Sequence, residues 1–219
     1  MSEIFSQVQL RVLGTLIEKQ LSTPEYYPLT RNALIAGCNQ KSNRDPAMTL
    51  AEGEAIDALT ALRERDLVRE VHDPSGRVPR YAHRVNAVFG LDGPQAAVMC
   101  ELMLRGAQTA GEIRNRGTRL AQFASVEEVE GILKGLAERE APLVMLLPRQ
   151  AGERERRWAH LLAGEPSFAK QTASAIPQPP PPSENEATRL AQLEGEIAEL
   201  REQVAGLRAA FEEFKSKFE

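Results

Sequence analysis

The densest run of hydrogen-bonding side chains in the sequence forms a short segment near its N-terminus. Amide, ammonium, guanidinium and carboxylate groups crowd together there, at Asn39, Gln40, Lys41, Asn43, Arg44 and Asp45. These donors and acceptors could bind a ligand or the backbone of a partner protein. Equally, Asn43 and Asp45 could form Asx-type turns while Arg44 ties the loop to a neighbouring segment. The sequence leaves both interpretations of this loop open.

Arginines in two segments with the pattern of short β-strands form a second group of candidates. They are Arg77, Arg80 and Arg84 in the first segment, and Arg149, Arg154, Arg156 and Arg157 in the second. Guanidinium groups suit the phosphates of DNA, which position a protein on the duplex. Charged side chains on exposed strands also prevent pairing with other sheets. Phosphate contact and solubility are therefore alternative roles for these arginines.

Sequence motifs for catalysis, cofactors and metals are absent. The chain has no G-x-G-x-x-G after a strand, no P-loop, no G-x-S-x-G, no C-x-x-C and no H-E-x-x-H. His83 and His160 each follow an aromatic residue by two positions, which favours a role in packing over metal binding. We therefore expect neither an enzyme nor a cofactor.

The elements that would position these residues follow one order twice. Apolar spacing predicts helices at about 4–20, from a Thr30 cap to about 40, and from a Thr49 cap to about 66 with Ile56, Leu59 and Leu62 inward. Two extended runs, 67–72 and 78–85, flank Asp73-Pro74-Ser75-Gly76, which suits a type I turn. Three helices followed by a β-hairpin is the order of a winged helix.

A second set of the same elements follows. Helices are expected at about 93–105, 109–116 and from a Ser125 cap onward, and a hairpin at 143–147 and 154–162. Arg80-Tyr81-Ala82-His83 and Arg157-Trp158-Ala159-His160 match 77 residues apart, counted from their positions in the sequence. This internal repeat predicts two tandem winged-helix domains, at residues 1–90 and 91–163.

The C-terminal part has a different composition. Residues 164–183 are proline-rich and should act as an extended spacer. Residues 184–219 carry a heptad pattern that predicts a two-stranded parallel coiled coil and hence a homodimer, with core positions at Leu190, Leu193, Ile197, Leu200, Val204 and Leu207. Docking of this helix on the protein's own body or on another chain is the alternative. Deleting residues 184–219 should convert a dimer to a monomer by light scattering, and an unchanged mass would contradict the coiled coil.

Charge and cysteine content suggest a compartment and a class of partner. The formal charge of −4 comes from the tail, so the remainder is neutral and exerts no overall attraction for nucleic acid or anionic membranes. Two cysteines in apolar stretches, and an N-terminus without a basic start or an apolar run, point to the cytoplasm. No apolar run is long enough to span a bilayer.

The region around the polar loop resembles a known family. Residues 21–30 (LSTPEYYPLT) and Cys38–Pro46 (CNQKSNRDP) are similar to the YceH family of bacterial proteins, and the resemblance covers about residues 3–162. It implies a tandem winged-helix fold and transfers no catalytic or binding residues. The linker and coiled coil lie outside the part that we assign to the family core.

Overall, the sequence predicts a mainly α-helical protein with small β-hairpins: two tandem winged-helix domains plus a C-terminal coiled-coil helix. The expected function is non-enzymatic protein interaction, because the predicted third helices begin with acidic residues such as Glu52 and Glu127. A DNA-binding regulator that uses the arginines of the hairpins is the alternative.

Overall fold

A computed structural model describes residues 4–72, 78–149 and 153–164, which belong to one compact unit, Met1–Pro166. This unit is mainly helical, with two small antiparallel sheets among the described residues. Arg77, the turn at 73–76, and the linker and coiled-coil residues from 165 onward lie outside the described residues. The predictions made for them therefore stay predictions.

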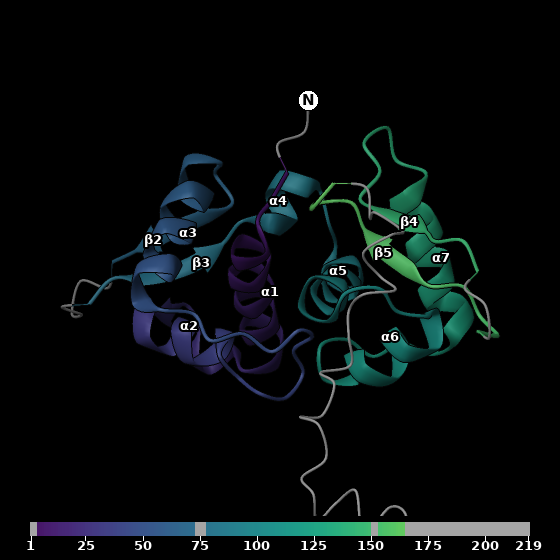
Figure 1. Cartoon of the computed structure of the whole chain (residues 1–219), viewed down its shortest axis with the longest axis horizontal. Coiled ribbons are helices and arrows are strands. Elements are labelled where there is room, and N and C mark those ends of the chain that lie inside the picture. The colour runs from purple at the N-terminus through teal and green to yellow at the C-terminus, as the bar shows by residue number, and fades with distance from the viewer. Residues whose placement is uncertain (1–3, 73–77, 150–152, 165–219) are drawn as a thin grey trace, which may run out of the picture. The chain divides into compact units, whose positions relative to one another are not determined.

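The first half contains three helices and a three-stranded sheet (Figure 1). Its elements are α1 (Gln7–Ser22), β1 (Leu29–Thr30), α2 (Arg31–Cys38), α3 (Glu52–Glu64), β2 (Val68–Val71) and β3 (Arg80–His83). The strand order is β1-β3-β2, and all pairs are antiparallel. The apolar pattern did not predict strand β1 or the 3₁₀ turn η1 (Pro24–Tyr26). Strand β1 has only two residues and η1 only three, too few to show a periodic pattern.

The second half repeats this order after a short helix, α4 (Val85–Phe89). Its elements are α5 (Gly93–Arg105), α6 (Ala110–Arg116), η2 (Gly117–Arg119), α7 (Val126–Ala137), β4 (Val144–Leu146) and β5 (Trp158–His160). An isolated bridge joins Gln108 to Trp158. It corresponds to the pairing of Leu29 with Tyr81 in the first half, since in each half the segment before the second helix pairs with the last strand.

Side-chain caps fix where most helices begin. Thr30 and Ser125, which the sequence predicts as caps, each accept a hydrogen bond from the backbone N–H three residues later. Thr109 caps α6 in the same way. The prediction of a Thr49 cap is wrong, because α3 begins at Glu52. The side chain of Asn39 explains why α3 begins later than predicted. Its amide oxygen accepts a hydrogen bond from the Leu50 N–H and its amide nitrogen donates to the Leu50 carbonyl, which holds Leu50 outside the helix.

Burial confirms two of the three expected core positions of α3. Leu59 and Leu62 are buried. Ile56, however, is exposed, so the prediction that it faces inward is wrong. The buried face of α3 is formed by Ala55, Ala58, Leu59 and Leu62, and this orientation of the helix leaves Ile56 on the outer face.

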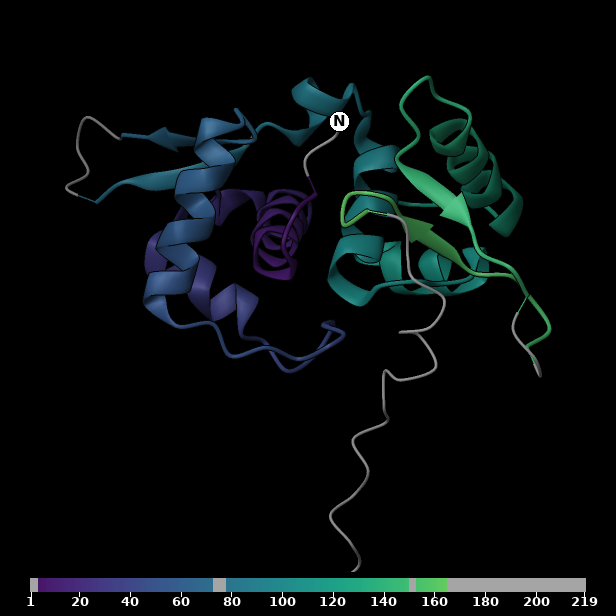
Figure 2. The same cartoon turned by 45° about the horizontal axis from the view of Figure 1, so that its top comes forward.

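Helices α1 and α5 pack against each other in the middle of the unit (Figures 1 and 2). A β-carbon added at Gly14 of α1 would lie 2.8 Å from Cδ2 of Leu104 on α5, so a side chain there would prevent this approach. The Cys100 thiol donates to the Gly14 carbonyl at 3.3 Å across the same contact. One continuous apolar cluster therefore contains residues from both sides of the predicted boundary at 90/91.

No helix in the described part of the chain is long and apolar enough to cross a membrane.

A polar seam between the two halves

The loop Asn39–Pro46 is held by Arg44, which points into the protein. Its guanidinium donates to both carboxylate oxygens of Glu18 on α1, at 3.2 and 2.5 Å. It also donates to the carbonyls of Gly37 and Asn43, both at 2.8 Å, and to Oε1 of Gln40. The side chains of Arg44 and Glu18 are both fully buried. Arg44 therefore ties the loop to neighbouring segments. This is the alternative to ligand or partner binding that the sequence left open for Arg44.

Glu18 links the first half to the second. Besides Arg44, it accepts a hydrogen bond from Arg119 of η2, 101 residues later in the chain. Burial alone would raise the pKa of Glu18, but the hydrogen bond and charge of Arg44, together with the charge of Arg119, bring this pKa below its usual range. The carboxylate is thus held ionised inside the protein by one arginine from each half.

The loop also makes direct contact with α5. The backbone N–H of Asp45 donates to the Leu104 carbonyl at 2.9 Å. Arg105, which donates to the side-chain oxygen of Asn43, lies 3.1 Å from the buried carboxylate of Glu101. Burial raises the pKa of Glu101, and the charge of Arg105 opposes this rise. Neither oxygen of Glu101 has a partner with hydrogen-bond geometry, so its contact with Arg105 is an ion pair by distance only.

The same chain of contacts continues to the second hairpin. Arg116 donates to Oε1 of Gln108 at 2.8 Å, and Gln108 donates to the Glu101 carbonyl at 3.0 Å. Glu112 pairs with both Arg116 and Arg157. We call this connected set the polar seam: Glu18, Asn43, Arg44, Glu101, Arg105, Gln108, Glu112, Arg116, Arg119 and Arg157. It brings together residues of the predicted interaction loop and of the predicted phosphate-contacting hairpin.

The remaining loop candidates divide between the interior and the surface. Asn39 is used to hold Leu50, and Gln40 is half-buried beside Arg44. Lys41 and Asp45 are exposed. Asn39, Gln40 and Asn43 are half-buried, so among the predicted loop residues only Arg44 is buried.

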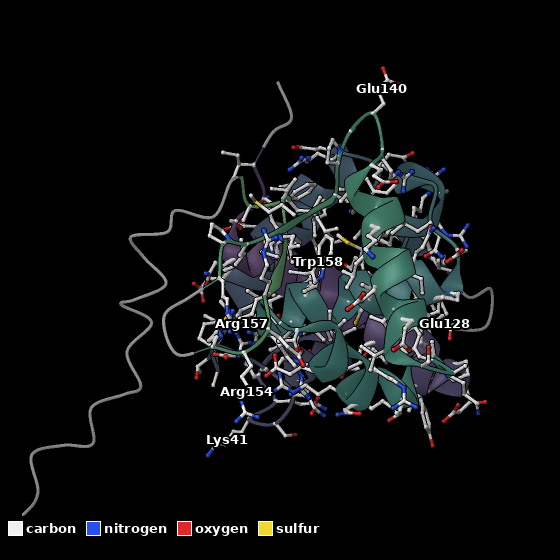
Figure 3. All side chains as sticks on the ribbon, turned by 90° about the vertical axis from the view of Figure 1, so that its right-hand side faces the viewer. Lys41, Glu128, Glu140, Arg154, Arg157 and Trp158 are labelled. Carbon is white, nitrogen blue, oxygen red and sulfur yellow. The ribbon has the colours of Figure 1, made fainter. Side chains whose placement is uncertain are left out.

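Most of the described hairpin arginines bond to this chain. Arg80 donates to the Pro28 carbonyl and Arg84 pairs with Asp66. In the second hairpin Arg149 donates to the Glu153 carbonyl, Arg156 to the Leu147 carbonyl, and Arg157 to Glu153 and Glu112. Arg154 is exposed and has no hydrogen bond or ion pair within the described residues. Figure 3 shows Arg154 and Arg157 on one side of Trp158, and Glu128 of α7 on the other.

Metal-binding side chains do not gather in the described part of the chain: no group of three or more His, Cys, Asp or Glu residues there could hold an ion. Cys38 and Cys100 are free and buried. Burial raises the pKa of both thiols, which disfavours the reactive thiolate.

The two histidines at equivalent strand positions should make the protein sensitive to acid. Burial lowers the pKa of His83 and of His160 to about 4. Unfolded histidines titrate near pH 6.5, so between pH 6.5 and 4 the unfolded state binds more protons and stability falls as pH falls. We expect each histidine to cost about 2–3 kcal/mol of unfolding free energy between pH 7 and 4.5, at about 1.4 kcal/mol per pKa unit.

Urea denaturation at both pH values tests this expectation. The variant His83→Gln should lose less stability on acidification than the native protein. Equal acid sensitivity in the variant and the native protein would show that His83 does not titrate with unfolding.

Comparison with known proteins assigns the chain to a family. The family described as "Protein of unknown function, DUF480" matches residues 5–153. A UPF0502 protein of Geobacter sulfurreducens is 49% identical over 222 aligned residues, covering 100% of both chains. A UPF0502 protein of Vibrio parahaemolyticus is 46% identical, covering 95% of this chain and 97% of its own.

The chain belongs to the DUF480 family. This confirms the resemblance to YceH proteins, which belong to the same family. The matched region, 5–153, agrees with the part of the chain that we assigned to the family core. The Geobacter relative nevertheless aligns along the whole chain, so the similarity extends through the proline-rich and heptad segments as well.

Sequence reasoning missed the acidic members of the seam. Glu18 lies on the same side of α1 as Arg11 and Thr15, beside the apolar stripe. All three residues are buried. Polar residues at spacings of four and three within an otherwise apolar helix could have indicated a second buried face. Glu101, alone among the apolar residues of Val98–Leu104, carries a similar signal.

Proposed function

We propose that this DUF480 protein is a non-enzymatic interaction module with two tandem winged-helix units, which binds a protein partner and dimerises through its heptad segment. The element order of each half supports the winged-helix part of this proposal. Three helices precede each hairpin, and the segment before the second helix pairs with the last strand, as Leu29 does with Tyr81 and Gln108 with Trp158. Residues 1–90 and 91–163 would be the two units.

The charge of the two third helices is the observation that carries the functional proposal. In helix-turn-helix relatives, the N-terminal part of the recognition helix enters the major groove of DNA. The corresponding exposed residues are Glu52, Glu54 and Asp57 on α3, and Glu127, Glu128 and Glu130 on α7. Carboxylates there would repel phosphates, and the same surface would attract a basic partner protein. Homodimerisation through residues 184–219 would present two copies of this surface.

Charge reversal on α7 tests the proposal. In a lysate of Geobacter sulfurreducens, which has a relative of this chain, the native protein should capture a protein that Glu127→Lys with Glu130→Lys fails to capture. Both positions are exposed, so the fold should tolerate the change. The control, Glu138→Lys with Glu140→Lys, makes the same charge change at the other end of α7 and should retain capture. Equal capture by both variants would contradict a role for the acidic surface.

A DNA-binding regulator is the second candidate, and the second hairpin favours it. Arg149, Arg154 and Arg156 are exposed, and none of them pairs with a carboxylate in the described part of the chain. Fluorescence anisotropy with mixed-sequence duplex DNA at about 50 and 200 mM salt separates the candidates, because phosphate contacts weaken steeply with salt. We expect no saturable binding at low salt. Salt-sensitive binding that is lost with Arg154→Ala and Arg156→Ala would instead establish the regulator.

A further inference from the structure

Three arginines lie along the outer side of the polar seam. The side chains of Arg105, Arg116 and Arg119 are 18%, 39% and 36% exposed. They come from different elements: Arg105 ends α5, Arg116 ends α6, and Arg119 lies in η2. Gln108 connects Arg105 and Arg116, since it bonds both Arg116 and the backbone of Glu101, the ion-pair partner of Arg105. Arg119 is connected to Arg105 through Glu18, Arg44 and Asn43.

Positive charge exceeds negative charge in this cluster. The seam contains five arginines and only three glutamates by its definition above, and a fourth glutamate, Glu153, pairs with Arg157 at its end. Burial lowers the pKa of Arg105, and the like charges of Arg116, Arg119 and Arg44 add to this effect. Close like charges destabilise a fold unless an anion balances them.

Within the described residues, the partners of Arg116 and Arg119 do not use every donor of these guanidiniums. A guanidinium has five N–H donors. Arg119 uses one terminal nitrogen to bond Glu18, and Arg116 donates a hydrogen bond to Gln108 and pairs with Glu112 at 3.5 Å. Glu18 thus holds Arg119, Gln108 and Glu112 hold Arg116, and Asn43 holds Arg105. Side chains held in this way lose little conformational entropy when they bind a ligand.

We infer that Arg105, Arg116 and Arg119 form a binding site for a phosphate group at the junction of the two halves. Arginine is suited to this ligand, because its planar fork matches two phosphate oxygens and its charge persists at all physiological pH values. A phosphate group would bring negative charge to this arginine-rich cluster and accept hydrogen bonds from guanidiniums of three elements. The inference does not depend on the proposed protein partner, since the acidic residues of α3 and α7 are not members of the seam.

Titration with inorganic phosphate at constant ionic strength tests the site, with ³¹P line broadening and calorimetry as readouts. The native full-length chain should bind saturably, and Arg116→Gln should bind at least about ten-fold more weakly, a loss of about 1.4 kcal/mol. Arg63→Gln is the control, since Arg63 is an exposed arginine of α3 that pairs with Glu70. Arg119→Lys, which keeps a cation beside Glu18, provides a second variant if Arg116→Gln does not fold, and it should also weaken binding.

Absence of saturable binding by the native chain would overturn the inference. Equal affinity of Arg116→Gln and Arg63→Gln would also overturn it, because phosphate would then bind elsewhere. Competition by a mixed-sequence duplex would identify a nucleic-acid backbone as the source of the phosphate. Binding that the duplex leaves unchanged would identify a small phosphate-bearing molecule, and both results support the site.

Discussion

Replacing Glu18 with glutamine should lower the free energy of unfolding by about 3–5 kcal/mol, the usual cost of leaving one partner of a buried ion pair uncompensated. Glu18 and Arg44 are both fully buried, and Arg119 depends on the same carboxylate. The amide would keep the shape of the side chain but leave the guanidinium of Arg44 without a counter-charge. Urea denaturation followed by circular dichroism measures the loss.

Two further variants test whether the loss of stability comes from the unpaired buried charge at Glu18. Glu130→Gln changes an exposed glutamate on α7 and should leave the stability within about 0.5 kcal/mol of native, as surface substitutions usually do. Glu18→Met combined with Arg44→Leu removes both charges and should recover much of the loss, because apolar pairs often replace buried ion pairs without cost. A Glu18→Gln variant as stable as Glu130→Gln would show that the seam does not hold the two halves together.

The second large effect is expected where α1 approaches α5. Gly14→Val should lower the free energy of unfolding by about 3 kcal/mol, because overpacking a tightly packed core forces backbone or side-chain shifts. The added β-carbon would lie 2.8 and 2.9 Å from Cδ2 and Cγ of Leu104, closer than carbon atoms approach in real structures. Thermal melting should show the loss as a lower midpoint of a single transition, since the core is shared by both halves.

A glycine on an open helix face provides the matched control. A β-carbon at Gly131 of α7 would meet nothing within 4 Å. Gly131→Ala should therefore raise the stability by about 0.5–1 kcal/mol through helix propensity. Destabilisation by both substitutions, or by neither, would argue against close packing at Gly14 as the cause.

Local sequence signals predicted most of the helices and strands. Apolar spacing located α5, and Thr30 and Ser125 were recognisable caps, because helix periodicity and capping depend on residues within a few positions of one another. The match between the Tyr81 and Trp158 strands likewise indicated the repeat of elements. The predicted cap at Thr49 was wrong, because the start of α3 is decided by the side chain of Asn39, eleven residues before Leu50.

The tertiary structure decided what the polar residues do. Arg44 was recognisable as distinctive, but its partner Glu18 lies 26 residues away and Arg119 lies 101 residues from that glutamate. Such pairings depend on the packing of α1 against α5, which no local pattern encodes. By itself the sequence determined where the helices and hairpins form, because those signals are local. Only the fold decided that Arg44 of the loop points inward and that arginines of both halves meet around the buried carboxylate of Glu18, since contacts between distant segments arise from packing.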